Sequence, residues 1–149
     1  MKGGKIMSNL LDARTSQNAS YANSISIPVT TTPQLFAQLT LDTTGATRNL
    51  RTQITGTAAI QLPLIPVLSS VIVTIVRGTT PSDIIIYSVR DVLDTSIVGP
   101  QVISFTASDF NVPITANNRV VYTAFISTDA AAGVTRVGPE SFNATIYSE

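Results

Sequence analysis

The chain of 149 residues contains no cysteine, no histidine and no tryptophan, and only 12% of its residues are charged. The absence of cysteine and histidine excludes disulfides, thiolate chemistry, zinc sites of the usual kind and every catalytic triad that uses a histidine. Nine basic residues balance nine acidic ones, whereas a nucleic-acid binder normally carries a basic excess on one face. We therefore expect no nucleic-acid partner, no metal and no cofactor.

Catalysis is not expected either. The only lysines are Lys2 and Lys5, and the seven aspartates and two glutamates show no recognisable pairing. Acid–base catalysis needs positioned groups with tuned pKa values. The sequence predicts that the chain is not an enzyme and has no catalytic, cofactor-binding or metal-binding residues.

The N-terminal region lacks the apolar segment of a secretory signal peptide. We interpret residues 1–6 as translated leader, because they back-translate to a ribosome-binding site ahead of a second start at Met7. The longest charge-free span, residues 52–76, is broken by two prolines and polar residues. A membrane span needs about 20 continuous apolar residues, so no membrane span is expected.

Hydroxyl groups supply most of the polarity, with 21 threonines and 15 serines. Threonine suits the exposed face of a strand, so the composition favours β structure. The length predicts one domain with a real core. Low charge together with a mean hydropathy of +0.30 indicates that some apolar surface is buried between subunits.

Two β-branched apolar runs, residues 71–76 and 84–89, flank a polar loop with Gly78 and Pro81. Branching at Cβ favours the extended chain, so this segment predicts a hairpin. Both runs are apolar on both faces, which is typical of strands covered on both sides. We place this hairpin at the centre of a two-layer β fold.

Turn signals separate further predicted strands, and residues 90–100 are the only segment that tolerates a helix, of one or two turns. About eight strands indicate an all-β, single antiparallel β-sandwich or jelly roll. Residues 24–149 form this domain, and residues 1–23 form a flexible arm, mobile or docked on a neighbouring subunit. The other predicted strands are residues 25–30, 35–41, 49–57, 101–106, 119–128, 134–137 and 141–148. The predicted connections are residues 42–45, 58–68, 107–118 and 129–133.

Several polar residues are of types that occur in metal or sugar sites, but their patterns favour structural roles. Asp91 and Asp94 are interpreted as turn or capping residues, because two carboxylates fall short of the six to eight oxygens that calcium takes. The loop residues Asp109, Asn111, Asn117 and Asn118 are interpreted as turn formers rather than as a sugar or calcium loop.

Arg48 and Arg51 are interpreted as solubilising charge near a strand end, with an anion site or an inter-subunit salt bridge as the alternative. The aromatic residues at strand spacing are expected in the core or in a subunit interface rather than in a binding groove. These aromatic residues are Tyr87, Tyr122, Phe125 and Tyr147.

The C-terminal stretch combines an aromatic strand, residues 121–126, with the sequence VGPESFN at residues 137–143. This pattern resembles the C-terminal region of exosporium-type spore-surface proteins of Bacillus-like bacteria (exosporium protein C-like). The strand at residues 71–78, with the pattern V-x-I-x-R-G, and residues 49–56 are also similar. The chain departs from the family pattern at Ala144, where glycine is expected, and its arm has no cysteines.

The resemblance implies a tumour-necrosis-factor-like jelly roll that trimerises, with a structural role on the spore surface and no catalysis. It implies that the chain is a partner for itself, with other spore-surface proteins as further candidates. It places the chain in the exosporium or coat, made without a secretory signal peptide. Two alternatives stay open, a carbohydrate- or surface-binding β-sandwich module and a viral or phage jelly-roll capsid or fibre protein.

Overall fold

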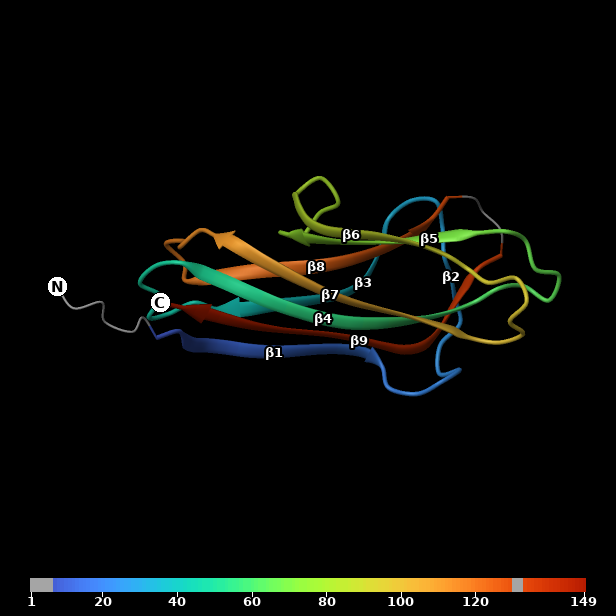
Figure 1. Cartoon of the computed structure of the whole chain (residues 1–149), viewed down its shortest axis with the longest axis horizontal. Helices are drawn as coiled ribbons and strands as arrows, with labels where there is room; N and C mark the ends of the chain where they lie inside the picture. The colour runs from blue at the N-terminus through green and yellow to red at the C-terminus, as the bar shows by residue number, and fades with distance from the viewer. Residues whose placement is uncertain (1–6, 130–132) are drawn as a thin grey trace.

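The computed structural model describes residues 7–129 and 133–149, and every regular element within these ranges is a β-strand (Figure 1). No helix that could cross a membrane occurs in them. The proposed leader and part of the predicted turn at residues 129–133 lie outside the described residues. The strands are β1 (Asn9–Ala19), β2 (Ile27–Pro28), β3 (Gln34–Asp42), β4 (Leu50–Gln61), β5 (Ser70–Arg77), β6 (Ile84–Val92), β7 (Gln101–Val112), β8 (Arg119–Thr128) and β9 (Thr135–Ser148).

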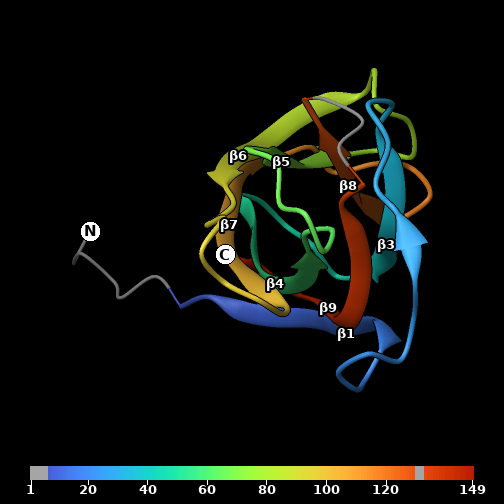
Figure 2. The ribbon, with the colours of Figure 1, turned by 90° about the vertical axis from the view of Figure 1, so that its right-hand side faces the viewer.

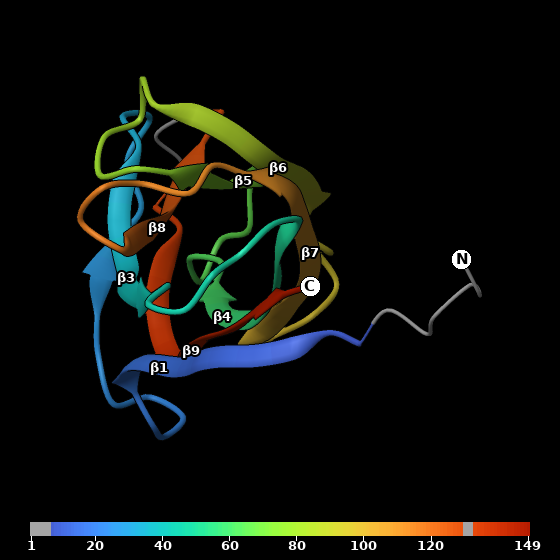
Figure 3. The same ribbon diagram turned by 90° about the vertical axis from the view of Figure 1, so that its left-hand side faces the viewer.

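The strands form two antiparallel sheets that pack face to face. The first has the order β1-β9-β4-β7, with the short β2 also paired to β9, and the second has the order β3-β8-β5-β6. Figures 2 and 3 view the sandwich from its two ends and show β6 beside β7 at one side. This order is that of a jelly roll of eight main strands, so the predicted fold class is confirmed.

The hydrogen-bonded pairs β5–β6, β4–β7, β3–β8 and β1–β9 are nested around the β5–β6 hairpin. Each strand before the hairpin pairs with the strand that lies equally far after it. The chain is therefore one long antiparallel ribbon, with the hairpin at its tip, rolled so that alternate pairs enter opposite sheets. The hairpin predicted from the runs at residues 71–76 and 84–89 is confirmed by the pairing of β5 with β6.

The hairpin does not lie at the centre of the fold, and that prediction is wrong for its second strand. β6 is the edge strand of its sheet, and Ile84 and Ile85 are more than half exposed. β5 lies inside the sheet between β6 and β8, and its inward side chains are fully buried. Ile84 and Ile85 therefore face solvent, whereas Ile86, Tyr87 and Val89 are partly buried against the core.

Residues 1–23 were predicted to form a flexible arm, but most of the described part of this segment is a strand. Asn9–Ala19 forms β1, which pairs along its length with β9. Its sequence shows no apolar alternation because most of its side chains are exposed and only Ala19 is buried. Backbone hydrogen bonds to β9, rather than side-chain burial, hold this strand in the sheet, and hydrophobic periodicity does not report them.

Other strands end at different residues than predicted, because they extend into segments that were expected to be connections. β4 continues to Gln61 and β7 continues to Val112, each paired with the other. No helical turn forms at residues 90–100; β6 ends at Val92 and an irregular loop follows. β9 is continuous through Pro139, although two strands were predicted there. Long strands form because each has a paired neighbour over its whole length.

The core lies between the sheets and is centred on Phe105. Its ring contacts Phe36 and Tyr87 from one sheet and Phe142 from its own, with ring centroids 6.3 to 6.4 Å apart. Gly56 is the cross-strand neighbour of both Phe105 and Phe142. A Cβ at Gly56 would collide with the Phe105 ring and lie 2.8 Å from the Ser141 carbonyl oxygen.

We expect the substitution Gly56→Ala to lower the free energy of unfolding by roughly 1–3 kcal/mol, because the added methyl overpacks the core. Urea denaturation followed by far-ultraviolet circular dichroism measures this change. The exposed neighbour variant Thr55→Ser is the control and is expected to shift stability by less than about 0.5 kcal/mol. Equal stability of Gly56→Ala and the wild type would contradict the packing of Phe105 over Gly56.

Candidate functional site

Ten of the sixteen large apolar side chains that are exposed in the described residues lie between residues 64 and 102. They come from the β4–β5 connection, the edge strand β6, the β6–β7 connection and the start of β7. Leu64 and Val98 are 97% and 98% exposed. We name this surface the apolar side; it consists of Leu64, Ile65, Val67, Leu68, Ile84, Ile85, Val92, Ile97, Val98 and Val102.

Two features set the apolar side apart from scattered surface apolar residues. Its strands β6 and β7 are both edge strands, with one unpaired hydrogen-bonding edge each. The charged residues Arg90 and Asp129 form an ion pair, in which Arg90 donates to Asp129 at 2.8 Å. Their opposite charges leave no net charge at this position. Hydrogen bonds from Ser70 and Arg90 lower the pKa of Asp129 to about 2. Leu64, Ile97 and Val98 line one hollow, and Leu68 and Val92 line another. Exposed apolar side chains that lie together in this way are typical of a protein–protein contact.

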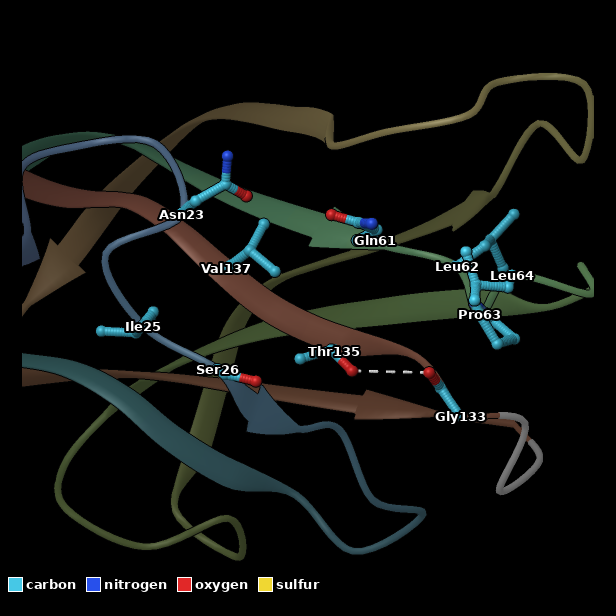
Figure 4. A pocket seen from close by; sticks show the side chains of 10 residues that line it. All are labelled: Asn23, Ile25, Ser26, Gln61, Leu62, Pro63, Leu64, Gly133, Thr135 and Val137. Atoms are coloured by element: carbon cyan, nitrogen blue, oxygen red, sulfur yellow. Dashed lines mark hydrogen bonds between the residues drawn. The ribbon is translucent and has the colours of Figure 1, made fainter.

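A hollow of about 400 Å³ lies beside this region, between the β1–β2 connection, the end of β4 and the start of β9 (Figure 4). Its wall carries two amides, Asn23 and Gln61, and two hydroxyls, Ser26 and Thr135, above apolar side chains. Thr135 donates to the carbonyl oxygen of Gly133 at 3.5 Å. None of the described residues that line it is charged, so it offers no group for acid–base chemistry.

A buried polar cluster joins the two sheets at the other end of β7. Arg77 of β5 donates two hydrogen bonds to Asp109 of β7, at 2.7 and 2.8 Å. Tyr122 of β8 donates to the same carboxylate at 2.8 Å, and its oxygen also lies 2.8 Å from the Thr52 hydroxyl. Burial raises the pKa of Tyr122, and the hydrogen bond to Asp109 raises that of Arg77. Each of these four side chains has a hydrogen-bond partner within the cluster, so the cluster has a structural role and holds the two sheets together.

A second buried ion pair holds the VGPESFN segment. Arg136 and Glu140 are almost fully buried, and two hydrogen bonds of 2.6 Å join them. Gln34 of β3 accepts from Arg136 at 3.0 Å, and Asn18 of β1 donates to Glu140 at 2.9 Å. The segment that carries the spore-protein resemblance therefore connects both sheets and the first strand.

The predicted turn residues behave as turn residues in two places. Asp94 accepts hydrogen bonds from the backbone and hydroxyl of Ser96, which lower its pKa. Asn117 accepts from the Thr115 hydroxyl at 2.7 Å, and Asn118 adopts a positive φ of 54°. Asp91 lies in β6. In the described part of the chain, no three acidic side chains come together to hold a metal.

Asp109 is the residue that sequence reasoning misplaced. It was predicted in a loop with Asn111, but it lies inside β7 and is buried. The alternation of Ile103, Phe105 and Ala107 extends to Asp109, and this periodicity was the signal available in the sequence. A charged residue at a core position needs a partner from the other sheet, and the sequence does not show that Arg77 provides it.

Arg51 lies at the surface, and the aromatic residues predicted for the core or an interface are found in different places. Arg51 donates to Ser8 at 2.5 Å and lies over the Tyr147 ring, 5.8 Å from its centroid. Tyr122 is fully buried and Tyr87 packs against the core. Phe125 is buried as well. Core packing is thus confirmed for Tyr122 and Tyr87, whereas Phe125 and Tyr147 lie outside the core cluster. Arg48 contributes its backbone carbonyl oxygen to a bond with Ser148.

No family model matches the chain, and no curated protein matches it. Among solved structures, the chain is similar to one from the T13 IBDV viral particle, with a TM-score of 0.57 and 11% identity over 90% of this chain. It is also similar to dimeric latent PorU from Porphyromonas gingivalis, with a TM-score of 0.52 and 11% identity over its full length. The chain spans 30% and 14% of those two chains. At this identity the likeness shows the β-sandwich fold alone.

The substitution Asp109→Asn should reduce the free energy of unfolding by about 3–5 kcal/mol, because it leaves the Arg77 guanidinium buried without a counter-charge. Urea denaturation monitored by Tyr fluorescence reports this loss. Arg14→Gln removes the exposed pair between Arg14 and Asp12 and should cost at most about 1 kcal/mol. A similar small loss in both variants would argue against a buried tie between the sheets.

Proposed function

We propose that the chain is a self-assembling structural subunit of a bacterial spore surface, in the exosporium or coat, and that copies meet through the apolar side. The observation that carries this proposal is that ten exposed apolar side chains come from residues 64–102, around the edge strands β6 and β7, in a domain whose own core is complete without them. A trimer is the assembly that the family resemblance favours.

The energetics favour association through this surface. Fully burying one aliphatic side chain contributes roughly 1.5–3 kcal/mol, although the members that are half covered already contribute less. Association costs on the order of 4–15 kcal/mol in lost freedom and side-chain ordering. Ten such residues are enough to exceed that cost. The low charge of the chain also keeps repulsion between packed copies small.

The spore assignment rests on the resemblance in residues 137–143. In the folded chain this segment lies in β9, with Phe142 in the core and Glu140 in the buried ion pair. Such positions suit a sequence pattern that preserves a fold rather than a reaction. The proposal accordingly includes no catalysis and no cofactor.

A viral or phage capsid or fibre protein is the second candidate. The similarity to a chain of the T13 IBDV viral particle supports this candidate at the level of the fold. The two candidates differ in when the gene is expressed. Transcript measurement through a sporulation time course separates them, because a spore-surface subunit rises late in sporulation and a phage subunit rises with neighbouring phage genes.

Size-exclusion chromatography with multi-angle light scattering tests the assembly itself on the whole chain. We expect a discrete oligomer, with three subunits favoured, that survives dilution. The double substitution Leu64→Asp with Val98→Asp should convert it to monomer, because a contact would bury both carboxylates without partners. Both positions are almost fully exposed, so folding should be unchanged by circular dichroism.

Leu10→Asp is the matched control, since Leu10 is an exposed apolar residue of β1 away from the apolar side. It should leave the oligomer intact. A wild-type chain that is monomeric at every concentration would overturn the proposed assembly, and loss of the oligomer in Leu10→Asp alone would place the contact elsewhere.

A further inference from the structure

The outer face of the sheet β1-β9-β4-β7 carries an array of hydroxyl and amide side chains. Residues alternate along a strand between the two faces of a sheet, and the inward set includes Ile54, Phe105 and Ala144. The outward set forms three rows across the strands. We name it the hydroxyl face; its rows are Ser104, Thr57 and Ser141; then Thr106, Thr55, Asn143 and Thr15; then Ser108, Gln53 and Thr145.

Cross-strand hydrogen bonds hold parts of this array in place. The hydroxyls of Thr57 and Ser141 lie 2.9 Å apart, and Thr15 donates to the amide oxygen of Asn143 at 2.9 Å. The second bond leaves the Asn143 amide nitrogen for another acceptor. Because these side chains are already ordered, a ligand that binds them loses less side-chain entropy.

The hydroxyl face contains no charged member, and an aromatic residue borders it. Phe110 follows Ser104, Thr106 and Ser108 on the outward face of β7, beside a β-bulge opposite Arg51, and it is 74% exposed. In the same row, the Arg51 guanidinium covers the Tyr147 ring. A shallow hollow of about 190 Å³ lies among Gln53, Thr55, Asn143 and Thr145. The face is therefore an uncharged surface that is bordered by Phe110 and by the stacked pair of Arg51 and Tyr147.

We propose that the hydroxyl face binds a neutral polysaccharide. Amide side chains present a donor and an acceptor together, which matches adjacent hydroxyls of a sugar ring, and Gln53 and Asn143 are diagonal neighbours on β4 and β9. Phe110 offers an apolar surface for the C–H face of a sugar ring. A charged ligand would lose hydration without gaining a counter-charge on this face. The hydroxyl face adjoins the apolar side at Val102, two residues before Ser104 on the outward face of β7. The two surfaces share no residue, so the inference does not depend on assembly.

Affinity electrophoresis in native gels tests this proposal with the whole chain. The probes are hydroxyethyl cellulose, a neutral polymer, and carboxymethyl cellulose, its anionic counterpart. We expect the neutral polymer to retard the protein and the anionic one to retard it less. Thr55→Lys, which places a charge in the middle row, should weaken retardation by the neutral polymer at least about tenfold. Phe110→Ala should weaken it as well.

Thr40→Lys is the matched control, because Thr40 is an exposed strand residue on β3, in the other sheet. It adds the same charge and should retain binding. Absence of retardation by the neutral polymer, or equal loss in Thr40→Lys and Thr55→Lys, would overturn the proposal. Light scattering on the same samples reports the oligomer separately, so loss of binding with an intact oligomer is distinguished from failure of assembly.

Discussion

The packing of the Phe105 ring over the bare backbone of Gly56 is the contact on which the sandwich depends. Phe105 contacts Phe36 and Tyr87 across the interior and Phe142 beside it. The ring occupies the space that a side chain at residue 56 would fill. Because Gly56 and Phe105 are paired on neighbouring strands of one sheet, this close approach sets where the ring lies in the core, and the aliphatic side chains around it fill the remaining volume.

Two buried ion pairs fix the sheets against each other away from this centre. Arg77 and Asp109 join β5 to β7, and Arg136 and Glu140 link β9 to β1 and β3 through Asn18 and Gln34. Nearly all strongly buried charge is used in this way. Two uncharged surfaces remain as candidates for interaction: an apolar side at the β6 and β7 edges and a hydroxyl face on one sheet.

The candidate surfaces were only partly visible in the sequence. Low charge and high apolar content predicted surface apolar residues, yet the run at β6 was assigned to the interior because its pattern matches a strand covered on both faces. The exposure of Ile84 and Ile85 follows from the place of β6 at a sheet edge, which is a property of strand order. The hydroxyl face was also not recognised, because Thr55, Asn143 and Thr106 come together only when β4, β9 and β7 are in register.

The sequence by itself determined the all-β class, the approximate strand positions and the β5–β6 hairpin, because β-branching, alternation and turn residues act locally. Tertiary structure alone decided that Asn9–Ala19 is a strand, that Asp109 is buried beside Arg77, and which strand lies at each edge. These outcomes depend on hydrogen bonds and charge pairs between residues far apart in the chain. The local sequence pattern does not show which residues will be partners. Strand and charge pairing depend on how the antiparallel ribbon rolls into two sheets.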